Sequence, residues 1–277
     1  MSLRLLVFGR GWMGAQWAER VPGSVLTDAD VADAAAVGRA LDEVRPDRVL
    51  NAAGKTGRPN VDALEGRPDE VLRSNVVGPI VLATECRRRG LHLTHLGSGC
   101  IYTGDHGGRG YAEDDPPNFH GSLYARSKAL AEAALREFDV LQLRVRLPFS
   151  SLPHPRNLLT KILSFRQVVR VANSVTVLDD AWPVAETLIA RAATGVYNLV
   201  NDGVERHDEV LRVWRERVDP AHGFAVVGQG DLGLVAGRSN CVLSTAKLHA
   251  EGLALPDFAA SLVRIVDLYA GHLRGAS

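Results

Sequence analysis

The stretch LRLLVFGRGWMGAQWAER, residues 3–20, decides the fold of this 277-residue chain. Its apolar run Leu3 to Phe8 is typical of a buried strand, and Gly9, Gly11 and Gly14 follow in the spacing G-x-G-x-x-G. A helical stretch comes directly after them. Glycines between a strand and a helix allow a tight turn, close approach of a pyrophosphate and packing of the helix on the strand. This order predicts a dinucleotide-binding unit.

Outward from this unit, short apolar runs alternate with helical stretches rich in Ala, Leu and Arg. Alternation of this kind predicts an α/β fold, a Rossmann-type doubly wound parallel sheet. The strand-like runs are Leu3 to Phe8, Arg48 to Ala52, Leu91 to Leu96, Val140 to Arg144 and Gly195 to Val200.

The Pro-rich stretch 148–155 breaks this rhythm. We therefore expect a dinucleotide-binding domain over residues 1–147, completed by 173–202. Residues 148–172 and 203–277 would form a smaller C-terminal substrate-binding cap, with the substrate between the cap and the carboxyl ends of the strands.

Composition narrows the classes of function. Acidic and basic residues cancel at 32 each, so neither nucleic acid nor an anionic membrane is an expected partner. No apolar run reaches membrane-spanning length, which predicts a cytoplasmic protein. Three cysteines, Cys86, Cys100 and Cys241, cannot all pair and lack metal-ligand spacing, so we expect reduced thiols and no metal site.

The cofactor site is expected at the glycine loop and the residues just after it. Asp28 or Asp30 could bind an adenosine ribose, as NAD requires, or could cap the next helix. Arg10 could instead receive the ribose phosphate of NADP. The residues leave both cofactors open, with NADP(H) favoured over NAD(H). The loop residues expected at the cofactor are Gly9, Arg10, Gly11, Trp12, Met13 and Gly14.

Tyr124-Ala-Arg-Ser-Lys128 places a phenol and an ammonium on one helical face. The pair could be a surface feature of an amphipathic helix. Alternatively, the ammonium lowers the phenol's pKa, so that Tyr124 exchanges a proton with a carbonyl or alcohol oxygen. Ser98, just past its strand, could hydrogen-bond the same oxygen. Cys100, two strand positions further on, should point to the same side as Ser98, although it could also be a buried, inert thiol.

Arginine has largely replaced lysine, since only four of the 32 basic residues are lysines. A guanidinium cannot donate a proton near neutral pH, so lysine should persist mainly where that ability is needed. Packing or drift is the alternative for each one. The four candidates are Lys55, Lys128, Lys161 and Lys247.

These motifs resemble the extended short-chain dehydrogenase/reductases, which share the glycine loop, Asn51-Ala-Ala-Gly54, Ser98 and Tyr-x-x-x-Lys. Longer stretches across nearly the whole chain are similar to the UDP-4-keto-6-deoxyglucose 3,5-epimerase/4-reductases of rhamnose biosynthesis, relatives of the dTDP-4-dehydrorhamnose reductases. These stretches are VLNAAGKTGRPNVD (49–62), SNVVGP (74–79), GSGCIY (97–102), PNFHGSLYARSK (117–128), RVRLPFSS (144–151), PRNLLTK (155–161), NSVTVLD (173–179) and GRSN (237–240).

The resemblance implies a reductive site of Ser98, Tyr124 and Lys128, with Cys100 as base and Lys161 as acid of an epimerisation. The thiolate would need nearby positive charge, from Lys128, Lys161 or the oxidised cofactor. Further implied cofactor residues are Asn51, Ala52, Ala53, Gly54 and Asn75, together with Tyr124 and Lys128. The implied substrate residues are Thr56, Arg58, Asn60, Ser98, His120, Arg156, Asn157, Arg238 and Asn240.

The implied substrate is a UDP- or dTDP-linked 4-keto-6-deoxyhexose, and the product an NDP-6-deoxyhexose such as NDP-L-rhamnose. A separate 4,6-dehydratase would supply the ketone, and a homodimer is compatible with the resemblance. Two departures stand out: the glycine loop is one residue shorter than G-x-x-G-x-x-G, and Ser98 replaces the usual threonine. The alternatives are a 4-ketoreductase without epimerase activity, an epimerase that recycles its own cofactor, and a non-catalytic dinucleotide-binding regulatory subunit.

Overall fold

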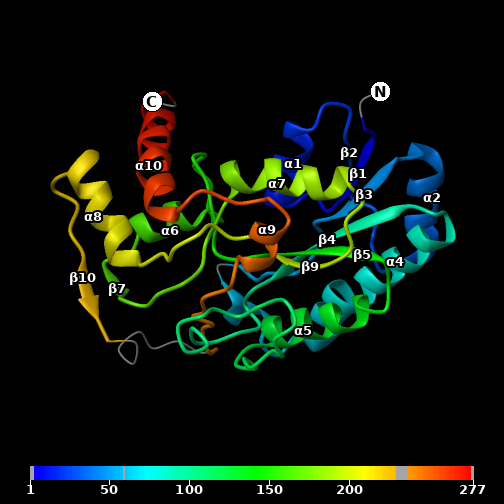
Figure 1. Cartoon of the computed structure of the whole chain (residues 1–277), viewed down its shortest axis with the longest axis horizontal. Helices are drawn as coiled ribbons and strands as arrows, with labels where there is room; N and C mark the ends of the chain where they lie inside the picture. Colours follow the sequence, from blue (N-terminus) through cyan, green and yellow to red (C-terminus); the bar gives the residue numbers. More distant parts are fainter. Residues whose placement is uncertain (1–2, 59, 229–235, 276–277) are drawn as a thin grey trace.

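A computed structural model describes residues 3–58, 60–228 and 236–275. Strands and helices alternate along the chain (Figure 1), and none of the described helices is long and apolar enough to cross a membrane. In chain order the elements are β1 (Leu5–Phe8), α1 (Trp12–Arg20), β2 (Val25–Thr27), α2 (Ala34–Val44), β3 (Arg48–Asn51), η1 (Val61–Leu64), α3 (Pro68–Leu72), η2 (Arg73–Val77), α4 (Gly78–Arg88), β4 (His92–Ser98), α5 (Leu123–Leu135), β5 (Val140–Val145), β6 (Pro148–Phe149), α6 (Leu158–Leu163), β7 (Gln167–Val169), β8 (Thr176–Val177), α7 (Leu178–Ala190), β9 (Gly195–Asn198), α8 (His207–Arg217), β10 (Ala225–Val227), α9 (Ala246–Ala250) and α10 (Phe258–Gly275).

The main sheet confirms the predicted fold class. In the described part of the chain it has six strands in the order β2-β1-β3-β4-β5-β9, and all the pairings are parallel. The chain leaves β1 toward β2 on one side and returns to β3 on the other, so the winding direction changes between β1 and β3. Loops at the carboxyl ends of strands diverge at such a point and leave room for a ligand.

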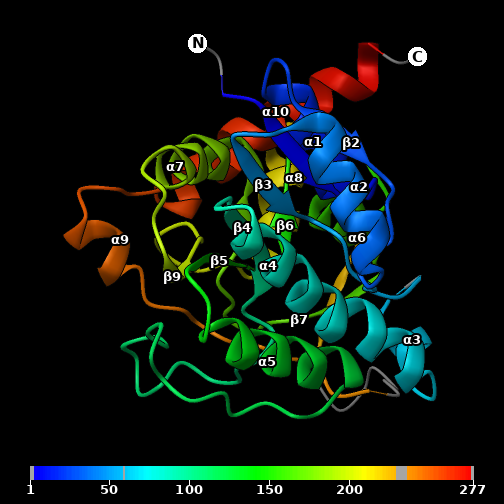
Figure 2. The same ribbon diagram turned by 90° about the vertical axis from the view of Figure 1, so that its right-hand side faces the viewer.

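Alternating side chains bury both faces of this sheet. Leu5 and Val7 of β1 join a core cluster with α1 and α7, whereas Leu6 and Phe8 join a second cluster with α2, α4 and α5. Figures 1 and 2 show these helices on opposite sides of the sheet. Between α1 and α7, the rings of Trp17 and Trp182 meet edge to face with their centroids 4.4 Å apart.

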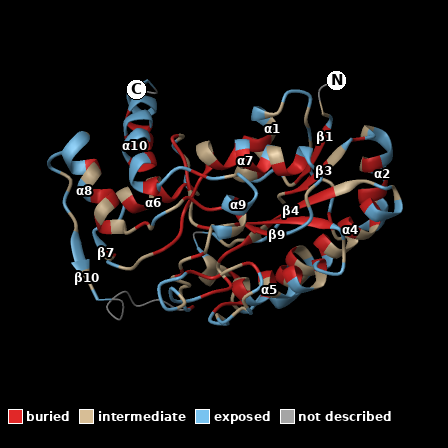
Figure 3. Cartoon of the chain, viewed as in Figure 1, coloured by how far each residue is buried: buried red, intermediate tan, exposed pale blue. Residues whose placement is uncertain are grey.

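A third core cluster joins α6, α8, α10 and the short strands beside them, at the end of the molecule far from β2 (Figures 1 and 3). Most of these elements come from the segments expected to form the cap, but β8, with Val175 and Val177, comes from the segment 173–202 that was expected to complete the dinucleotide-binding domain. One part of those segments packs elsewhere: Leu248 of α9 and Leu255 join the sheet cluster with α7. They share this cluster with Tyr197 of the outer strand β9. The exact domain division stays a prediction.

A buried ion pair ties β5 to α5. Arg144 is fully buried, and its guanidinium donates two hydrogen bonds, of 2.7 and 2.6 Å, to the Glu132 carboxylate. It also donates to the Glu113 carbonyl and to Asn198 of β9. A pair of this kind contributes little in itself, but removal of one partner leaves a charge without compensation.

We predict that Arg144→Met lowers the free energy of unfolding by about 3–5 kcal/mol, because Glu132 then stays buried with only Arg136, 3.6 Å away, as a cationic partner. The double variant Arg144→Met/Glu132→Gln should recover part of this loss. Urea unfolding measures both. A loss below about 1 kcal/mol in the single variant, the range of exposed pairs, would contradict the prediction.

Candidate active site

The three glycines after β1 have different surroundings. Gly9 has φ +102°, and a Cβ on it would lie 2.6 Å from the Ala53 nitrogen, while a Cβ on Gly14 would lie 2.0 Å from the Gly9 oxygen. A Cβ on Gly11 would meet nothing within 4 Å. Packing of the loop therefore requires Gly9 and Gly14, whereas Gly11 borders open space.

That open space lies at the N-terminus of α1. Gly11 is the N-cap residue, no side chain caps the helix, and its first turn carries no acidic residue. Backbone N–H groups of a first helical turn attract anions, and a missing side chain lets a phosphate come close. The loop thus fits a pyrophosphate, even though it is one residue shorter than in many similar sequences.

A cavity of about 550 Å³ opens beside this loop, a size suited to a small-molecule ligand. It brings together residues from the loop after β1, the loop after β3, helix α3 and the segment before α6. Of the predicted site residues, Gly9, Arg10, Gly11, Ala52, Ala53, Gly54, Thr56, Arg58 and Arg156 line it. Lys55 lines it too, half-exposed and 3.7 Å from the Glu70 carboxylate.

Two predicted cofactor residues use their side chains inside the protein. Asn51 is fully buried, bonds the His95 ring and accepts from the Ala53 nitrogen. Asn75 lies in the π-helical segment η2, accepts from the Lys55 nitrogen at 2.7 Å and donates to the Lys55 carbonyl and to Ser127. With their amides engaged in this way, both residues shape the loop that borders the cavity.

For the acidic residues after β2, the structure removes one of the two predicted roles, that of a helix cap. Neither Asp28 nor Asp30 caps the next helix, because Asp33 accepts from the nitrogens of Ala35 and Ala36 at the start of α2. Asp28 is exposed, and Asp30 pairs with Arg73 at 2.6 Å.

At the first turn of α1, Trp12 stacks on His154 with ring centroids 5.0 Å apart. The glycine loop therefore contacts the segment that leads into α6. Trp12 and its neighbour Met13 also pack against the sheet core, so both help to anchor the loop.

The serine and cysteine meet at the end of β4, although not in the way expected. Ser98 is the last residue of β4, where it pairs with Val145, so the strand runs two residues beyond Leu96. Cys100 lies in the turn that follows, and the strand alternation invoked for it is wrong. The turn nevertheless folds it back, because its backbone nitrogen donates to the Ser98 hydroxyl at 3.1 Å.

Helix α5 carries the tyrosine and lysine. Ser122 caps it by accepting from the Ala125 nitrogen, and Glu65 accepts from the Leu123 nitrogen at 2.6 Å. Lys128 is buried and donates to the Leu96 carbonyl at 3.0 Å. Burial lowers the pKa of Lys128 to about 8, against the opposing charges of Cys100 and Glu132.

The expected effect on the phenol is wrong. Burial raises the pKa of Tyr124, and the charge of Cys100 adds to the rise, while a hydrogen bond with Ser98 and the charges of Arg146 and Arg156 oppose it. The phenol therefore keeps its proton at neutral pH. The protonated phenol can act as a proton donor. Its hydrogen bond with Ser98 also places the Tyr124 and Ser98 hydroxyls next to each other.

Arg146, which is 3% exposed, was not among the site residues predicted from the sequence. Its Nη1 donates to the Cys100 sulfur at 3.0 Å, and its Nη2 donates to Asn173 Oδ1 at 2.6 Å. A signal was available: Arg146 follows β5 directly, Cys100 follows β4 closely, and the carboxyl ends of adjacent parallel strands lie side by side. Neither lysine expected to supply charge to Cys100 donates a hydrogen bond to its sulfur.

Lys161 lies on α6, half-buried. Burial lowers its pKa, and the charge of Arg156 lowers it further. Arg156 itself donates to the Thr56 hydroxyl in the cavity wall. Lys247, by contrast, donates to the Val196 carbonyl and lies over the Tyr197 ring, so the packing alternative holds for this lysine.

Four cations act electrostatically on Cys100, on Tyr124 or on one another. In the ranges that the structure describes, Lys128, Arg146, Arg156 and Lys161 form no ion pair with a carboxylate, although many other arginines of the chain do. Cationic groups left this way favour an anionic ligand or an anionic side chain between them.

Other predicted substrate residues have internal partners. Asn157 is buried and caps α6: its amide donates to the carbonyls of Ser150 and Leu152 and accepts from the Leu159 nitrogen, so a direct ligand contact by this side chain is not supported. Asn60 caps η1. Arg238 makes a two-pronged ion pair with Asp62, and the pKa of Asp62 is lowered chiefly by this hydrogen bonding.

The two remaining predicted substrate residues, Asn240 and His120, differ in exposure. Asn240 accepts from Asn173 at 3.3 Å and is half-buried, close to the partners of Arg146. His120 is exposed at the surface.

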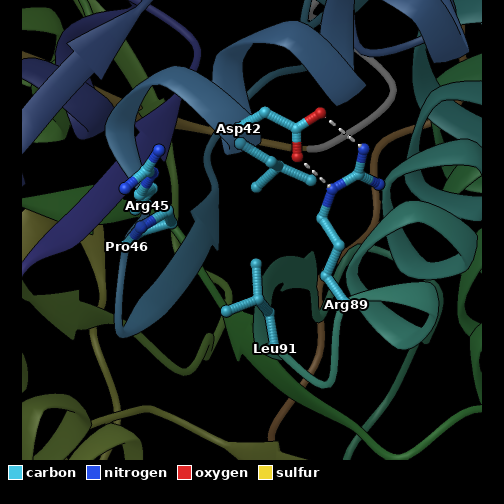
Figure 4. A pocket seen from close by; sticks show the side chains of 6 residues that line it. Asp42, Arg45, Pro46, Arg89 and Leu91 are labelled. Atoms are coloured by element: carbon cyan, nitrogen blue, oxygen red, sulfur yellow. Dashed lines mark hydrogen bonds and ion pairs between the residues drawn. The ribbon is translucent and has the colours of Figure 1, made fainter.

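A second hollow of about 420 Å³ lies elsewhere, between α2 and the end of α4 (Figure 4). The Arg89 guanidinium and the Asp42 carboxylate pair across it at 2.8 Å. None of the predicted site residues lines it, so the cavity at the glycine loop is the candidate site.

The chain is similar to proteins of deoxysugar synthesis. It is 38% identical to the bifunctional dTDP-4-dehydrorhamnose 3,5-epimerase/dTDP-4-dehydrorhamnose reductase of Arabidopsis thaliana, over 96% of this chain and 93% of the relative. It is 37% identical to a trifunctional UDP-glucose 4,6-dehydratase/UDP-4-keto-6-deoxy-D-glucose 3,5-epimerase/UDP-4-keto-L-rhamnose-reductase of the same plant, over 95% of this chain and 41% of that relative.

A solved structure is similar over nearly the whole chain. The UDP-rhamnose synthase of Acanthamoeba polyphaga mimivirus superposes with a TM-score of 0.92 and 32% identity, over 97% of this chain and all of that one. Residues 13–270 match the family described as the RmlD substrate binding domain. A match of this extent, on a Rossmann-type sheet with the glycine loop and the Tyr-x-x-x-Lys pair in place, shows that the chain belongs to the RmlD substrate binding domain family.

Proposed function

We propose that this chain is a nucleotide-sugar 3,5-epimerase and 4-ketoreductase. It would convert an NDP-4-keto-6-deoxyhexose into an NDP-6-deoxyhexose such as NDP-L-rhamnose. The observation that carries this proposal is the position of Cys100. Its backbone nitrogen donates to the Ser98 hydroxyl, its charge acts on Tyr124, and its sulfur accepts a hydrogen bond from the Arg146 guanidinium. A ketoreductase alone has no use for a thiol beside its proton donor. An epimerase does use one, because a thiolate can remove a hydrogen from carbon.

The epimerase half uses the acidity of hydrogens next to a carbonyl. A ketone at C4 acidifies the hydrogens at C3 and C5, because each carbanion is delocalised onto the C4 oxygen as an enolate. Cys100 as thiolate removes the hydrogen, the Ser98 and Tyr124 hydroxyls stabilise the oxyanion, and Lys161 returns a proton to the opposite face. The lowered pKa of Lys161 makes its ammonium a better acid near neutral pH.

The reductive half needs one proton at the same oxygen. A nicotinamide dinucleotide, when bound, supplies hydride to C4. Tyr124, held protonated by burial, gives its proton to the C4 oxygen, and Lys128 holds positive charge near the phenol. The glycine loop and the N-terminus of α1 would hold the pyrophosphate. Arg10, exposed beside the open space at Gly11, favours NADP(H) over NAD(H).

The unpaired cations suit the rest of the substrate. Arg156 and Arg58 line the cavity, and arginine binds phosphate oxygens through two parallel hydrogen bonds. The carrier would be UDP or dTDP. A 4,6-dehydratase would supply the ketone, because the trifunctional relative combines that activity with the epimerase and the reductase.

Two further expectations are part of the proposal. The enzyme would work in the cytoplasm, where thiols stay reduced, because Cys100 must be a free thiol. A homodimer stays a prediction.

With the keto sugar in deuterated water, we predict that the wild-type enzyme incorporates deuterium at C3 and C5 and that Cys100→Ala does not. The Lys161 ammonium exchanges its hydrogens with the solvent, so the proton that it returns to the carbanion carries the label. Mass spectrometry and NMR of the product measure this. Cys86→Ala is the matched control, because this buried thiol lies in the sheet core with a pKa that burial raises to about 12. Absence of deuterium in the wild-type product would remove the epimerase half.

Tyr124→Phe should reduce hydride transfer by about 10²–10⁴-fold, the usual contribution of a positioned acid, while the dinucleotide still binds. Absorbance at 340 nm follows turnover, and fluorescence titration follows binding. Tyr111→Phe removes a hydroxyl that bonds the Thr103 carbonyl outside the cavity, so it should keep its rate. Unchanged turnover of Tyr124→Phe would refute the assignment.

Gly11→Ala should fold normally yet bind the dinucleotide at least tenfold more weakly, about 1.4 kcal/mol, because its methyl group enters the open space at the start of α1. Gly14→Ala should instead lower stability, since its Cβ would collide with the Gly9 carbonyl. Gly271→Ala is the control, a helical glycine with open space around it. Thermal unfolding and dinucleotide titration separate these effects; equal binding by Gly11→Ala and wild type would contradict the placement of the pyrophosphate.

A further inference from the structure

Arg146 is a buried cation whose partners carry no formal negative charge unless Cys100 is ionised. Its side chain donates to the Cys100 sulfur, to Asn173 Oδ1 and to the Ser239 carbonyl. Across residues 3–58, 60–228 and 236–275 no carboxylate forms an ion pair with it. Arg144, two residues earlier and equally buried, has the Glu132 carboxylate as its counter-ion.

A buried charge without a counter-ion costs several kcal/mol, so the fold must compensate Arg146 in another way. Burial opposes its charged form, yet the pKa of Arg146 is raised, chiefly by the charges of Cys100 and Cys241. Of these two thiols, Cys241 donates to the Gly99 carbonyl at 3.2 Å, and burial raises its pKa. Cys241 therefore keeps its proton, and Cys100 is the group able to become the counter-ion.

We propose that Arg146 is a positioning residue that holds Cys100 as a thiolate and aims its sulfur at the substrate carbon. This inference rests on the proposed function of Cys100 as a base. The arginine does not touch the sugar, and it keeps its own proton throughout. When Cys100 removes a hydrogen, an S–H bond forms, the C–H bond breaks, and the electron pair moves onto the C4 oxygen.

The guanidinium is held in place before substrate arrives. Asn173 accepts from Arg146 while its backbone pairs with Glu205, through hydrogen bonds of 3.0 and 2.7 Å. The same Asn173 oxygen accepts from the Cys241 nitrogen at 3.2 Å. Because Asn173 and Ser239 fix Nη2 of Arg146, its Nη1 stays on the Cys100 sulfur. The arginine side chain therefore does not have to be ordered during the reaction.

Other groups that face Cys100 leave this role to Arg146. Lys128 acts on Cys100 through its charge, but its ammonium donates to the Leu96 carbonyl instead of the sulfur. Tyr124 is neutral, because burial raises its pKa. The Ser98 hydroxyl accepts from the Cys100 nitrogen and so places the backbone, not the charge.

The pH dependence of Cys100 alkylation by iodoacetamide tests the inference, with the rate at this one cysteine followed by peptide mass spectrometry. The pH at which the rate is half-maximal, the alkylation midpoint, is compared between the wild-type protein and its variants. Arg146→Met should raise this midpoint by at least one pH unit, and Arg146→Lys by less.

The matched control is Arg144→Met/Glu132→Gln, which removes the buried arginine two residues earlier, at the end of β5, together with its counter-ion. Its stability should change while its alkylation midpoint stays at the wild-type value. A general loss of packing cannot produce this contrast, because it would shift both proteins alike.

Deuterium exchange links the sulfur to the reaction. At neutral pH, exchange at C3 and C5 by Arg146→Met should fall at least tenfold and recover as the pH is raised. Reduction of an already epimerised keto sugar should fall less than the exchange does, since Arg146 acts on Tyr124 through its charge but donates no hydrogen bond to it. A merely structural role would lower both rates at every pH.

Two results would overturn the inference: an unchanged alkylation midpoint in a folded Arg146→Met or Arg146→Lys, or a midpoint that shifts as far in Arg144→Met/Glu132→Gln as in Arg146→Met. The proposed function fails separately. If Cys100→Ala still exchanges deuterium, Cys100 is not the base, whatever the alkylation midpoint is.

Discussion

Parallel pairing of β4 with β5 is the constraint on which the site depends. The two strands stay in register as far as Ser98 and Val145, so the residues just beyond them emerge at the same edge of the sheet. Cys100 and Arg146, 46 positions apart in the chain, meet there at 3.0 Å. Packing of α5 on η2 and the sheet then brings Tyr124 and Lys128 to the same edge. A shift of one residue between the strands would separate the thiol from the guanidinium.

Burial gives these groups their chemistry. Removal from water raises the pKa of Tyr124, lowers that of Lys128 to about 8 and lowers that of Lys161. The raised pKa keeps the phenol protonated as a donor, and the lowered pKa of Lys161 makes its ammonium a better acid. Burial of the cations that have no carboxylate partner is destabilising, and an anionic substrate or a thiolate offsets this effect.

The rest of the fold holds this edge rigid through buried amides. Asn51, Asn75, Asn157 and Asn173 each use their side chains on neighbouring backbone or side-chain groups of loops that border the site. Such amides resemble binding residues in a sequence, because both roles require a polar side chain in a loop. They act on the substrate through the shape of the loops. A charged substitution at any of them would disturb the cavity wall without removing a ligand contact.

The sequence by itself determined the features whose physical cause is local. Strand, glycine loop and helix follow one another within residues 3–20, and Tyr124 and Lys128 share a helical face by their spacing alone. The alternation of apolar runs and helical stretches indicated the parallel sheet, because this pattern too is local in the sequence. Only the tertiary structure decided which amides are consumed internally, that Cys100 sits in a turn, and that Arg146 is its cationic partner. These depend on burial and on contacts between strands far apart in the chain, and neither is encoded in the spacing of nearby residues.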